Sequence, residues 1–364
     1  MPDSSKPDHA RPLTAPRGAR LGRRAALMGT LSAMALAEAM SRARAQAPAV
    51  LNLYSSRHYN TDQALYDTFT KATGIRINRI EAEPDPLMER MRAEGANSPA
   101  DVFISVDAGR IERARQAGLL QPVRSAVLEQ SVPPHLRDPQ GHWFGFSKRA
   151  RVIIYARERA KAADVPTYES LADPGLKGKL VIRSSTNVYN QSLTGAMLAA
   201  HGEEKTEAWC RGLVANFARA PRGGDSDQIK AIAAGEADYG VVNTYYFVNL
   251  MRSKNETDRA MAHKVGVVFP NQADRGTHIN ISGGGVAAHA KNKDAAVKFL
   301  EYLVSLEAQS YFADGNSEYP VVPTAKTGAM LAELGSFKED QLNAQVFAAN
   351  NAKALQIMDR AGWK

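Results

Sequence analysis

Short apolar runs of strand length alternate with helix-length segments along most of this chain, and this alternation limits the possible folds more than any other feature of the sequence. The runs predicted as strands are 50–54, 76–80, 102–106, 151–155, 179–182, 239–242 and 265–269. The segments predicted as helices, from capping residues and apolar stripes, are 63–72, 86–94, 108–116, 191–201, 227–234 and 294–306. Strands that alternate with helices predict an α/β fold, in which helices cover both faces of a mostly parallel sheet.

The length of the chain leaves room for two such units. The sequence has 364 residues, of which 44% are hydrophobic and 23% charged, as in an ordinary globular protein. At about 150 residues per domain, two domains are expected. The pattern of strands and helices starts again after Phe144. The sequence therefore predicts two α/β lobes.

The positive charge of the chain is concentrated at its N-terminus. The whole sequence has a formal net charge of +8, but residues 1–45 hold eight Lys and Arg against three acids. The other 319 residues therefore carry a surplus of only three positive charges. A nucleic-acid-binding protein would present a basic patch on its folded part. We therefore expect no nucleic-acid partner.

Residues 1–45 have the three parts of an export signal. A long basic start precedes an apolar run, 25–39, that is too short to cross a bilayer, and Ala43-Arg44-Ala45 forms a small-x-small cleavage site. Arg23-Arg24, with Leu27 three residues on, is typical of a twin-arginine signal. We therefore predict a twin-arginine-type signal peptide at 1–45 and a periplasmic location. General secretion, or an amphipathic helix that stays attached, remains open.

Motifs of common enzyme classes are absent. The sequence has no Walker loop, no His-Glu-x-x-His, no Gly-x-Ser-x-Gly and no strand-linked Gly-x-Gly-x-x-Gly. The glycine run 283–285 is interpreted as a tight turn that brings the backbone close to a packed neighbour. Cys210, the single cysteine, is interpreted as a small buried apolar side chain.

Three predicted strand-to-helix loops each contain tyrosine. They are 55–60, 184–191 and 242–247, and the last holds the adjacent pair Tyr245-Tyr246. In open α/β sheets, ligands bind at the carboxyl ends of strands, where such loops lie. A tyrosine pair alone is common in protein cores, and a lone histidine such as His58 is more often a structural hydrogen-bonding residue. The three loops together favour a ligand site.

Five stretches carry a resemblance to a known family, and they are 53–62, 145–151, 171–179, 187–192 and 243–246. Over these stretches the chain resembles the periplasmic ferric-ion-binding proteins, which are the substrate-binding components of iron(III) ABC transporters. The resemblance extends from about Val50 to Trp363. The stretch 171–179 points only to binding proteins of this superfold, whereas the His-Tyr and Tyr-Tyr elements point to iron.

The resemblance implies the fold and its division. It implies the two-lobed periplasmic binding protein fold (type II), an α/β fold with a hinge between the lobes. The N-terminal lobe is expected to comprise 48–147 plus 269–303, and the C-terminal lobe 148–268 plus 304–364.

The resemblance also implies the ligands of the metal. Tyr59, Tyr189, Tyr245 and Tyr246 correspond to the iron-ligating tyrosines, and His58 to a fifth ligand that is used variably. Oxygen donors suit ferric iron, which is a small, hard and highly charged ion. Four phenolates around Fe(3+) leave a net charge of −1, which a nearby arginine would offset. The candidates for that positive charge are Arg57, Arg149 and Arg151.

The expected function is that of an extracytoplasmic solute-binding protein. It would capture ferric iron, Fe(3+), as its transported ligand and deliver it to an inner-membrane ABC permease and ATPase. No open coordination position is implied, so we expect a monomeric carrier and no enzyme. Two alternatives remain open: the same fold with another solute, such as a polyamine, a phosphonate or an organic acid, or an exported iron enzyme with tyrosine ligands.

Overall fold

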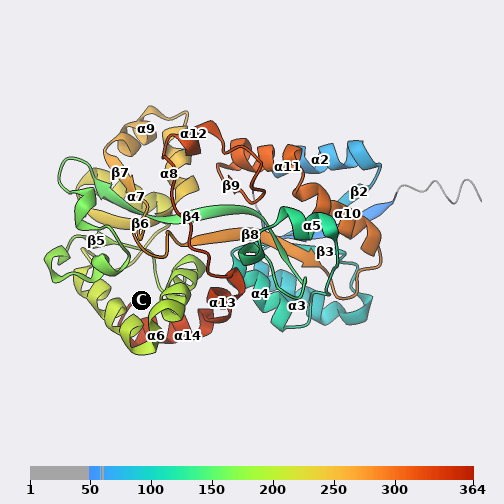
Figure 1. Ribbon diagram of the computed structural model, residues 1–364, viewed down its shortest axis with the longest axis horizontal. Coiled ribbons are helices and arrows are strands. Elements are labelled where there is room, and N and C mark those ends of the chain that lie inside the picture. The colour runs from blue at the N-terminus through green and yellow to red at the C-terminus, as the bar shows by residue number, and fades with distance from the viewer. Residues whose placement is uncertain (1–48, 58, 60) are drawn as a thin grey trace, which may run out of the picture. The chain divides into compact units, whose positions relative to one another are not determined.

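The computed structural model describes residues 49–57, 59 and 61–364. The predicted signal peptide at 1–45 and the candidate ligand His58 lie outside these described residues. Nine strands are described: β1 (Val50–Ser55), β2 (Arg76–Glu81), β3 (Val102–Val106), β4 (Phe144–Ala156), β5 (Leu180–Val181), β6 (Tyr239–Asn243), β7 (Val265–Val268), β8 (Ile279–Val286) and β9 (Tyr319–Pro320). They form a connected sheet in the order β2-β1-β3-β8-β4-β6-β5, and β7 and β9 both pair with β4 (Figure 1).

Strand β4 joins two groups of strands. Its first half pairs antiparallel with β8 and β9, and its second half pairs antiparallel with β6 and β7. On one side of this connection β1 pairs parallel with β2 and β3, and on the other side β5 pairs parallel with β6. Figure 1 shows β4 and β8 running between the two groups. This arrangement is that of two α/β lobes that share long connecting strands.

Helices cover both groups of strands. The α-helices are α2 (Asp62–Thr73), α3 (Pro84–Glu94), α4 (Ala108–Gln116), α5 (Ala126–Ser131), α6 (Val188–Asn216), α7 (Asp225–Ala234), α8 (Thr244–Met251), α9 (Glu256–His263), α10 (Lys293–Leu303), α11 (Leu306–Ser310), α12 (Ala329–Ala332), α13 (Ala344–Ala349) and α14 (Asn351–Arg360). The shorter helices are η1 (Gly95–Asn97), η2 (Pro134–Leu136), η3 (Ala162–Asp164), η4 (Glu169–Ala172), η5 (Pro174–Leu176) and η6 (Tyr311–Gly315), of which η6 is a π-helix. Helices α3 and α4 lie near β3, and α7 and α8 near β6 (Figure 1).

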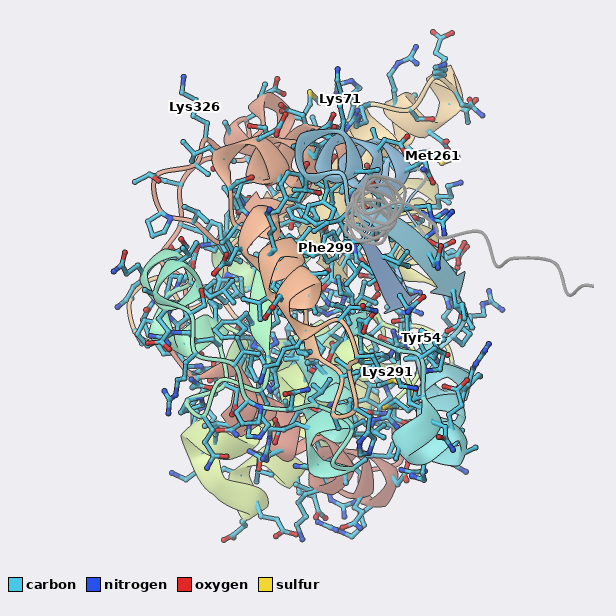
Figure 2. All side chains as sticks on the ribbon, turned by 90° about the vertical axis from the view of Figure 1, so that its right-hand side faces the viewer. Tyr54, Lys71, Met261, Lys291, Phe299 and Lys326 are labelled. Atoms are coloured by element: carbon cyan, nitrogen blue, oxygen red, sulfur yellow. The ribbon has the colours of Figure 1, made fainter. Side chains whose placement is uncertain are left out.

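Two hydrophobic clusters form the core. The larger includes the buried side chains of β1, β3 and α10, and the smaller includes residues of η4, α6 and α14. The predicted apolar stripe of α10 is confirmed, because its five members, Ala295, Ala296, Phe299, Leu300 and Leu303, are all buried. Phe299, labelled in Figure 2, packs edge-on against Phe69 of α2 with ring centroids 5.0 Å apart. Cys210 is buried in the smaller cluster, as predicted.

The glycine run 283–285 is not the predicted tight turn, and that prediction is wrong. These glycines lie inside β8, whose residues pair with β3 on one side and β4 on the other. A Cβ at Gly284 would lie 2.1 Å from the carbonyl oxygen of Phe103, and a Cβ at Gly285 would lie 1.9 Å from that of His142. The expected close approach of a packed neighbour is therefore present, but between strands.

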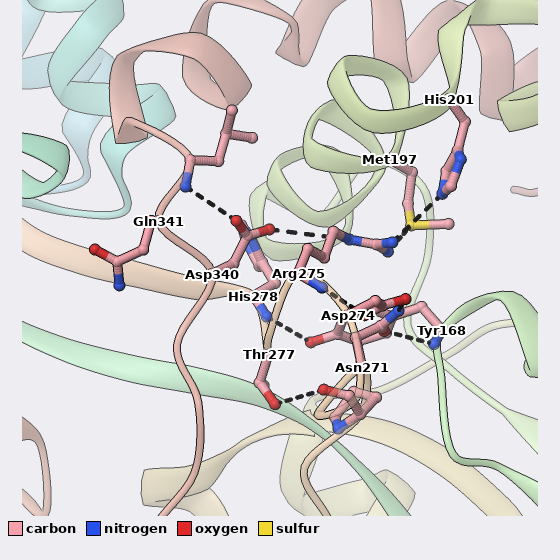
Figure 3. Close-up of polar contacts among 12 residues, drawn as sticks. Tyr168, Met197, His201, Asn271, Asp274, Arg275, Thr277, His278, Asp340 and Gln341 are labelled. Carbon is pink, nitrogen blue, oxygen red and sulfur yellow. Dashed lines mark hydrogen bonds and ion pairs between the residues drawn. The ribbon is translucent and has the colours of Figure 1, made fainter.

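The segment that leads into β8 is fixed by a polar network (Figure 3). Asn271 accepts a hydrogen bond from the backbone of Tyr168 over 3.0 Å, and the Tyr168 hydroxyl accepts one from the backbone of His278 over 3.1 Å. The same hydroxyl donates to the carbonyl oxygen of Arg151 in β4. Arg275 forms an ion pair with Glu169 over 2.6 Å. The network therefore anchors the start of β8 to β4 at the position of Arg151.

Within the described residues, no helix combines the length and the apolar character needed to cross a membrane.

Candidate metal centre

Tyr59 lies in the loop between β1 and α2 and is held beside Arg57. The Arg57 guanidinium carbon lies 4.7 Å from the centroid of the Tyr59 ring. Arg57 itself is buried, and it forms ion pairs with Asp62 over 2.9 Å and with Glu318 over 3.2 Å. Burial raises the pKa of Tyr59, and the negative charge of Glu318 adds to the rise. At neutral pH the metal-free protein therefore keeps this phenol protonated.

Tyr189 lies in the first turn of α6, where Asn187 is the N-cap residue. The Asn187 side chain accepts a hydrogen bond from the Tyr189 backbone over 3.1 Å, which begins the helix at this point. Three guanidinium carbons lie near the Tyr189 ring centroid, those of Arg183 at 5.4 Å, Arg149 at 5.7 Å and Arg151 at 5.8 Å. Burial nevertheless raises the pKa of Tyr189 to about 12.

Tyr245 and Tyr246 open helix α8, directly after β6. Their ring centroids are 4.3 Å apart, and the Tyr245 hydroxyl donates a hydrogen bond to the Tyr189 hydroxyl over 3.2 Å. Burial raises the pKa of Tyr245, and the phenols of Tyr189 and Tyr59 add to the rise. The structure thus brings all four predicted tyrosines into one cluster, although they come from three loops far apart in the sequence.

The three candidate arginines differ in their partners. Arg57 pairs with two carboxylates, and Arg151 pairs with Asp225 over 2.6 Å. Arg149 is 1% exposed, and among the described residues it has no carboxylate within ion-pair distance. Its Nη1 donates a long hydrogen bond to Ser282 over 3.4 Å, while its Nε and Nη2 have no hydrogen-bond partner within residues 49–57, 59 and 61–364.

Arg149 nevertheless keeps its charge. Burial alone would lower its pKa, but Tyr245, Asp107 and Tyr189 raise the pKa of Arg149 above its ordinary value. A buried cation without an ion-pair partner is unfavourable unless nearby negative charge compensates it. Arg149 is therefore positioned to interact with negative charge that forms on the phenols.

Phenols are the donors that this centre offers to a metal. Within the described part of the chain, no group of three or more His, Cys, Asp and Glu side chains is placed to hold a metal ion. Phenolate oxygen is a hard ligand, and hard ligands favour highly charged hard cations. His58, the predicted fifth ligand, is not among the residues that the structure describes.

Two further carboxylates near the phenols were not predicted from the sequence. Asp225 lies at the start of α7 and pairs with Arg151, and Glu318 precedes β9 and pairs with Arg57. Each is separated from its partner by more than 70 residues of sequence. No short motif connects them, and only the folded chain shows that these carboxylates belong to the site.

A model of the family described as bacterial extracellular solute-binding protein matches residues 97–335. This chain belongs to that family.

Relatives of this solute-binding protein include iron-binding proteins. It is 51% identical over 314 residues to Iron uptake protein A1 of Synechocystis sp., covering 86% of this chain and 87% of the relative. It is similar to the solved structure of Trichodesmium IdiA (FutA) in complex with iron and citrate ligands, with 56% identity and a TM-score of 0.85, covering 86% of this chain and 100% of that one. The ferric binding protein from Campylobacter jejuni has 41% identity and a TM-score of 0.81, with 86% and 100% covered.

These similarities confirm two predictions about the solute-binding protein. The resemblance to the periplasmic ferric-ion-binding proteins is confirmed by the relatives, and the two-lobed periplasmic binding protein fold is confirmed by the solved structures. The residue limits of the two lobes and the identities of the metal ligands stay predictions.

Proposed function

We propose that this protein captures ferric iron with the phenolates of Tyr59, Tyr189, Tyr245 and Tyr246 and delivers it to an ABC transporter. The main support for this proposal is that these four phenols lie in one cluster. Tyr59 comes from the strand group of β1, and the other three come from α6 and α8 in the strand group of β6. A ligand bound between them would hold the two lobes together.

The phenols explain how iron is held strongly and released. The pKa values of Tyr59, Tyr189 and Tyr245 lie above the ordinary value near 10, so the metal must displace a proton from each of these three phenols. The number of protons released on binding makes the affinity fall as the pH falls. Protonation of the ligands is therefore a route to release.

The negative charge expected for the iron-loaded centre would be compensated by Arg149, which has no ion-pair partner among the described residues. Fe(3+) and four phenolates give a net charge of −1, and Arg149 supplies the compensating positive charge. Arg57 and Arg151 already form ion pairs, Arg57 with Asp62 and Glu318 and Arg151 with Asp225, so their role is to hold the tyrosine rings in place. A fifth ligand should be neutral, because another anionic ligand would make the net charge of the loaded centre −2. A neutral imidazole, such as His58 could supply, meets this condition.

The proposed role also implies where the protein acts and how it delivers iron. The protein is exported to the periplasm through the signal at 1–45, by the twin-arginine route, and acts as a monomer. The lobes comprise 48–147 plus 269–303 and 148–268 plus 304–364, and they close on iron to present a shape that the inner-membrane permease and its ATPase accept. The names of the relatives support iron transport, so we infer carriage and no catalysis.

One observation favours a second candidate, an anionic solute such as a phosphonate or an organic acid. Two nitrogen atoms of Arg149 are buried without a hydrogen-bond partner from the residues that the structure describes, and a guanidinium is well suited to such anions. Titration calorimetry of the metal-free protein with each anion tests this alternative. Binding of the anion in the absence of iron would support it.

The colour of the iron-loaded protein tests the main proposal. Phenolate-to-iron(III) charge transfer absorbs visible light, so addition of chelated ferric iron to the metal-free protein should produce a visible band at one iron per chain. Tyr245→Phe keeps the ring but removes the oxygen, and it should weaken both the band and the binding. A colourless wild-type protein that does not retain iron would refute the proposal.

A further inference from the structure

Asp225, at the start of α7, is a buried carboxylate that connects the two tyrosine-bearing helices of one lobe. Its side chain is 0% exposed. The Oδ2 atom accepts a hydrogen bond from Arg151 Nη1 over 2.6 Å and another from the backbone N–H of Asn243 over 2.7 Å. One oxygen atom thus holds both the arginine beside Tyr189 and the residue that precedes α8.

The first connection leads to Tyr189. Arg151, held by Asp225 through Nη1, donates through Nη2 to the side chain of Asn190 over 2.8 Å. The amide nitrogen of Asn190 donates in turn to the carbonyl oxygens of Arg183 and Ser184, over 2.9 Å and 3.1 Å. Asn190 is the neighbour of Tyr189 in the first turn of α6, so this chain of hydrogen bonds sets where α6 begins relative to β4.

The second connection leads to the tyrosine pair. Asn243 is the last residue of β6 and the N-cap of α8, and its side chain makes no capping hydrogen bond. Its backbone N–H is bound by Asp225, and its side-chain oxygen accepts from Arg151 Nη1 over 3.2 Å. Tyr245 and Tyr246 follow two and three residues later. The same ion pair therefore fixes the start of both helices.

Asp225 also balances the positive charge around Tyr189. The guanidinium of Arg183 lies 3.5 Å from Asp225 Oδ1, on the side of the carboxylate away from the short contact with Arg151. Both arginines lie within 6 Å of the Tyr189 ring centroid. Without Asp225 these guanidiniums would repel one another and lose their common anchor.

We propose that Asp225 is a positioning residue for iron binding, which holds the phenols of Tyr189, Tyr245 and Tyr246 in the geometry that one metal ion requires. The inference rests on the proposed function. Within the described residues no hydrogen bond joins Asp225 to a phenol, and it acts on their arrangement through Arg151 and Asn243. The negative charge of Asp225 also raises the pKa of Tyr189, so loss of that charge alone would favour the phenolate and strengthen metal binding. A loss of affinity together with a shifted visible spectrum therefore reports the arrangement of the ligands.

The test compares Asp225→Asn with Asp227→Asn in the purified full chain. Asp227 lies on the same helix, two residues later, and its exposed side chain accepts a hydrogen bond from the Gly224 backbone. Ferric iron is supplied as its nitrilotriacetate complex, and affinity is measured by competition with that chelator. Asp225→Asn should lower the affinity by about tenfold or more, the effect of one charge-assisted hydrogen bond, and should shift the charge-transfer maximum. Asp227→Asn should leave both unchanged.

A double-mutant cycle separates positioning from a general loss of stability. If Asp225 acts on the phenols, Asp225→Asn should cost less affinity in a Tyr189→Phe background than in the wild type. Equal losses in both backgrounds, or an Asp225→Asn protein with wild-type affinity and spectrum, would overturn the inference. A wild-type protein that binds no ferric iron would overturn the proposed function and the inference together.

A second variant covers the case in which Asp225→Asn does not fold. Arg151→Lys keeps the positive charge, but an ammonium group cannot reach Asp225 and Asn190 in the way that the two guanidinium nitrogens do. It should shift the charge-transfer maximum and lower the affinity in the same direction. A wild-type spectrum and affinity for Arg151→Lys would then overturn the inference.

Discussion

Replacement of Arg149 by methionine should weaken iron binding. Arg149 is buried, its Nε and Nη2 atoms have no hydrogen-bond partner in the described part of the chain, and its guanidinium lies 5.7 Å from the Tyr189 ring centroid. The side chain of methionine fills similar space but carries no charge. The loaded centre would then keep its negative charge without compensation in a poorly solvated site.

The size of the effect follows from Coulomb's law. A unit positive charge about 6 Å from a net charge of −1, at an effective dielectric constant of about 20, contributes roughly 3 kcal/mol. That energy corresponds to about 100-fold in iron(III) affinity. Reduction to Fe(2+) makes the centre one unit more negative, so Arg149 favours the reduced form by a similar energy. Arg149→Met should therefore lower the reduction potential of bound iron by about 120 mV.

The unfolding temperature of the metal-free variant reports what Arg149 contributes to the fold. Burial opposes the charge of Arg149, but neighbouring groups hold its pKa above the ordinary value, so Arg149→Met should unfold at the wild-type temperature or slightly below it. Arg157→Met is the matched control, because Arg157 is exposed and its loss removes the same formal charge. Exposed charge is screened by solvent and salt, so this control should bind iron as the wild type does.

Three measurements decide the outcome: chelator competition for affinity, voltammetry for the potential, and thermal unfolding of the metal-free protein. The reasoning is refuted if Arg149→Met and Arg157→Met bind iron equally well. It is also refuted if Arg149→Met raises the reduction potential, because the sign of the charge effect would then be wrong.

Three other predictions concern the phenols, the N-terminal sequence and the closure of the lobes. Between pH 8 and pH 5 the pH lies below the raised pKa values of Tyr59, Tyr189 and Tyr245 in the metal-free site, so iron affinity should fall about tenfold per pH unit for each of these phenolates bound, and Tyr189→Phe should reduce that slope by one proton; an unchanged slope would remove Tyr189 from the ligand set. Arg23→Lys with Arg24→Lys should leave the precursor in the cytoplasm on fractionation, and normal export would point to the general secretory route. Iron loading should reduce the radius of gyration measured by small-angle scattering, whereas Tyr59→Phe should bind iron but close less; an equal change in both proteins would show that Tyr59 does not link the lobes.

The sequence predicted most of the strands because their apolar residues are consecutive or alternate. The predicted strand at 102–106 matches β3, and the predicted strand at 239–242 lies within β6. Strand β4 was predicted to start only at Arg151, although it starts at Phe144, because the charged residues Lys148 and Arg149 interrupt the apolar run before Arg151. Distant carboxylates and the phenol cluster allow these arginines to be buried, and local sequence contains no sign of those partners.

The tyrosines could be located from the sequence for a related reason. Each follows a strand, and the carboxyl ends of strands in an α/β sheet are where loops meet. Their partners were not visible, because Asp225 and Glu318 reach the site only through tertiary structure. The glycines of β8 were wrongly predicted to form a turn. They are required because the backbones of neighbouring strands pack closely against them.

In each lobe, an arginine held by carboxylates lies beside a candidate tyrosine ligand. Arg149 lies on the strand that connects the two lobes. In one lobe, Arg57 is held by Asp62 and Glu318 and lies against Tyr59. In the other, Arg151 is held by Asp225 and lies near Tyr189. Each of these arginines is neutralised within the metal-free protein, so each set of phenols can be ordered before iron arrives.

Arg149 lies on β4, the strand that joins the two groups, and its backbone pairs with Asn280 of β8. Its positive charge has no ion-pair partner among the described residues, although the negative charges of Asp107 and Glu318 act on it from a distance. If the four phenols bind one iron ion as proposed, phenolates from both lobes would add further negative charge near Arg149. That charge would form only when iron is bound with the lobes together, so Arg149 would favour the loaded, closed state over either lobe binding iron alone. On the proposed function, the arginine on the connecting strand would therefore couple iron capture to closure.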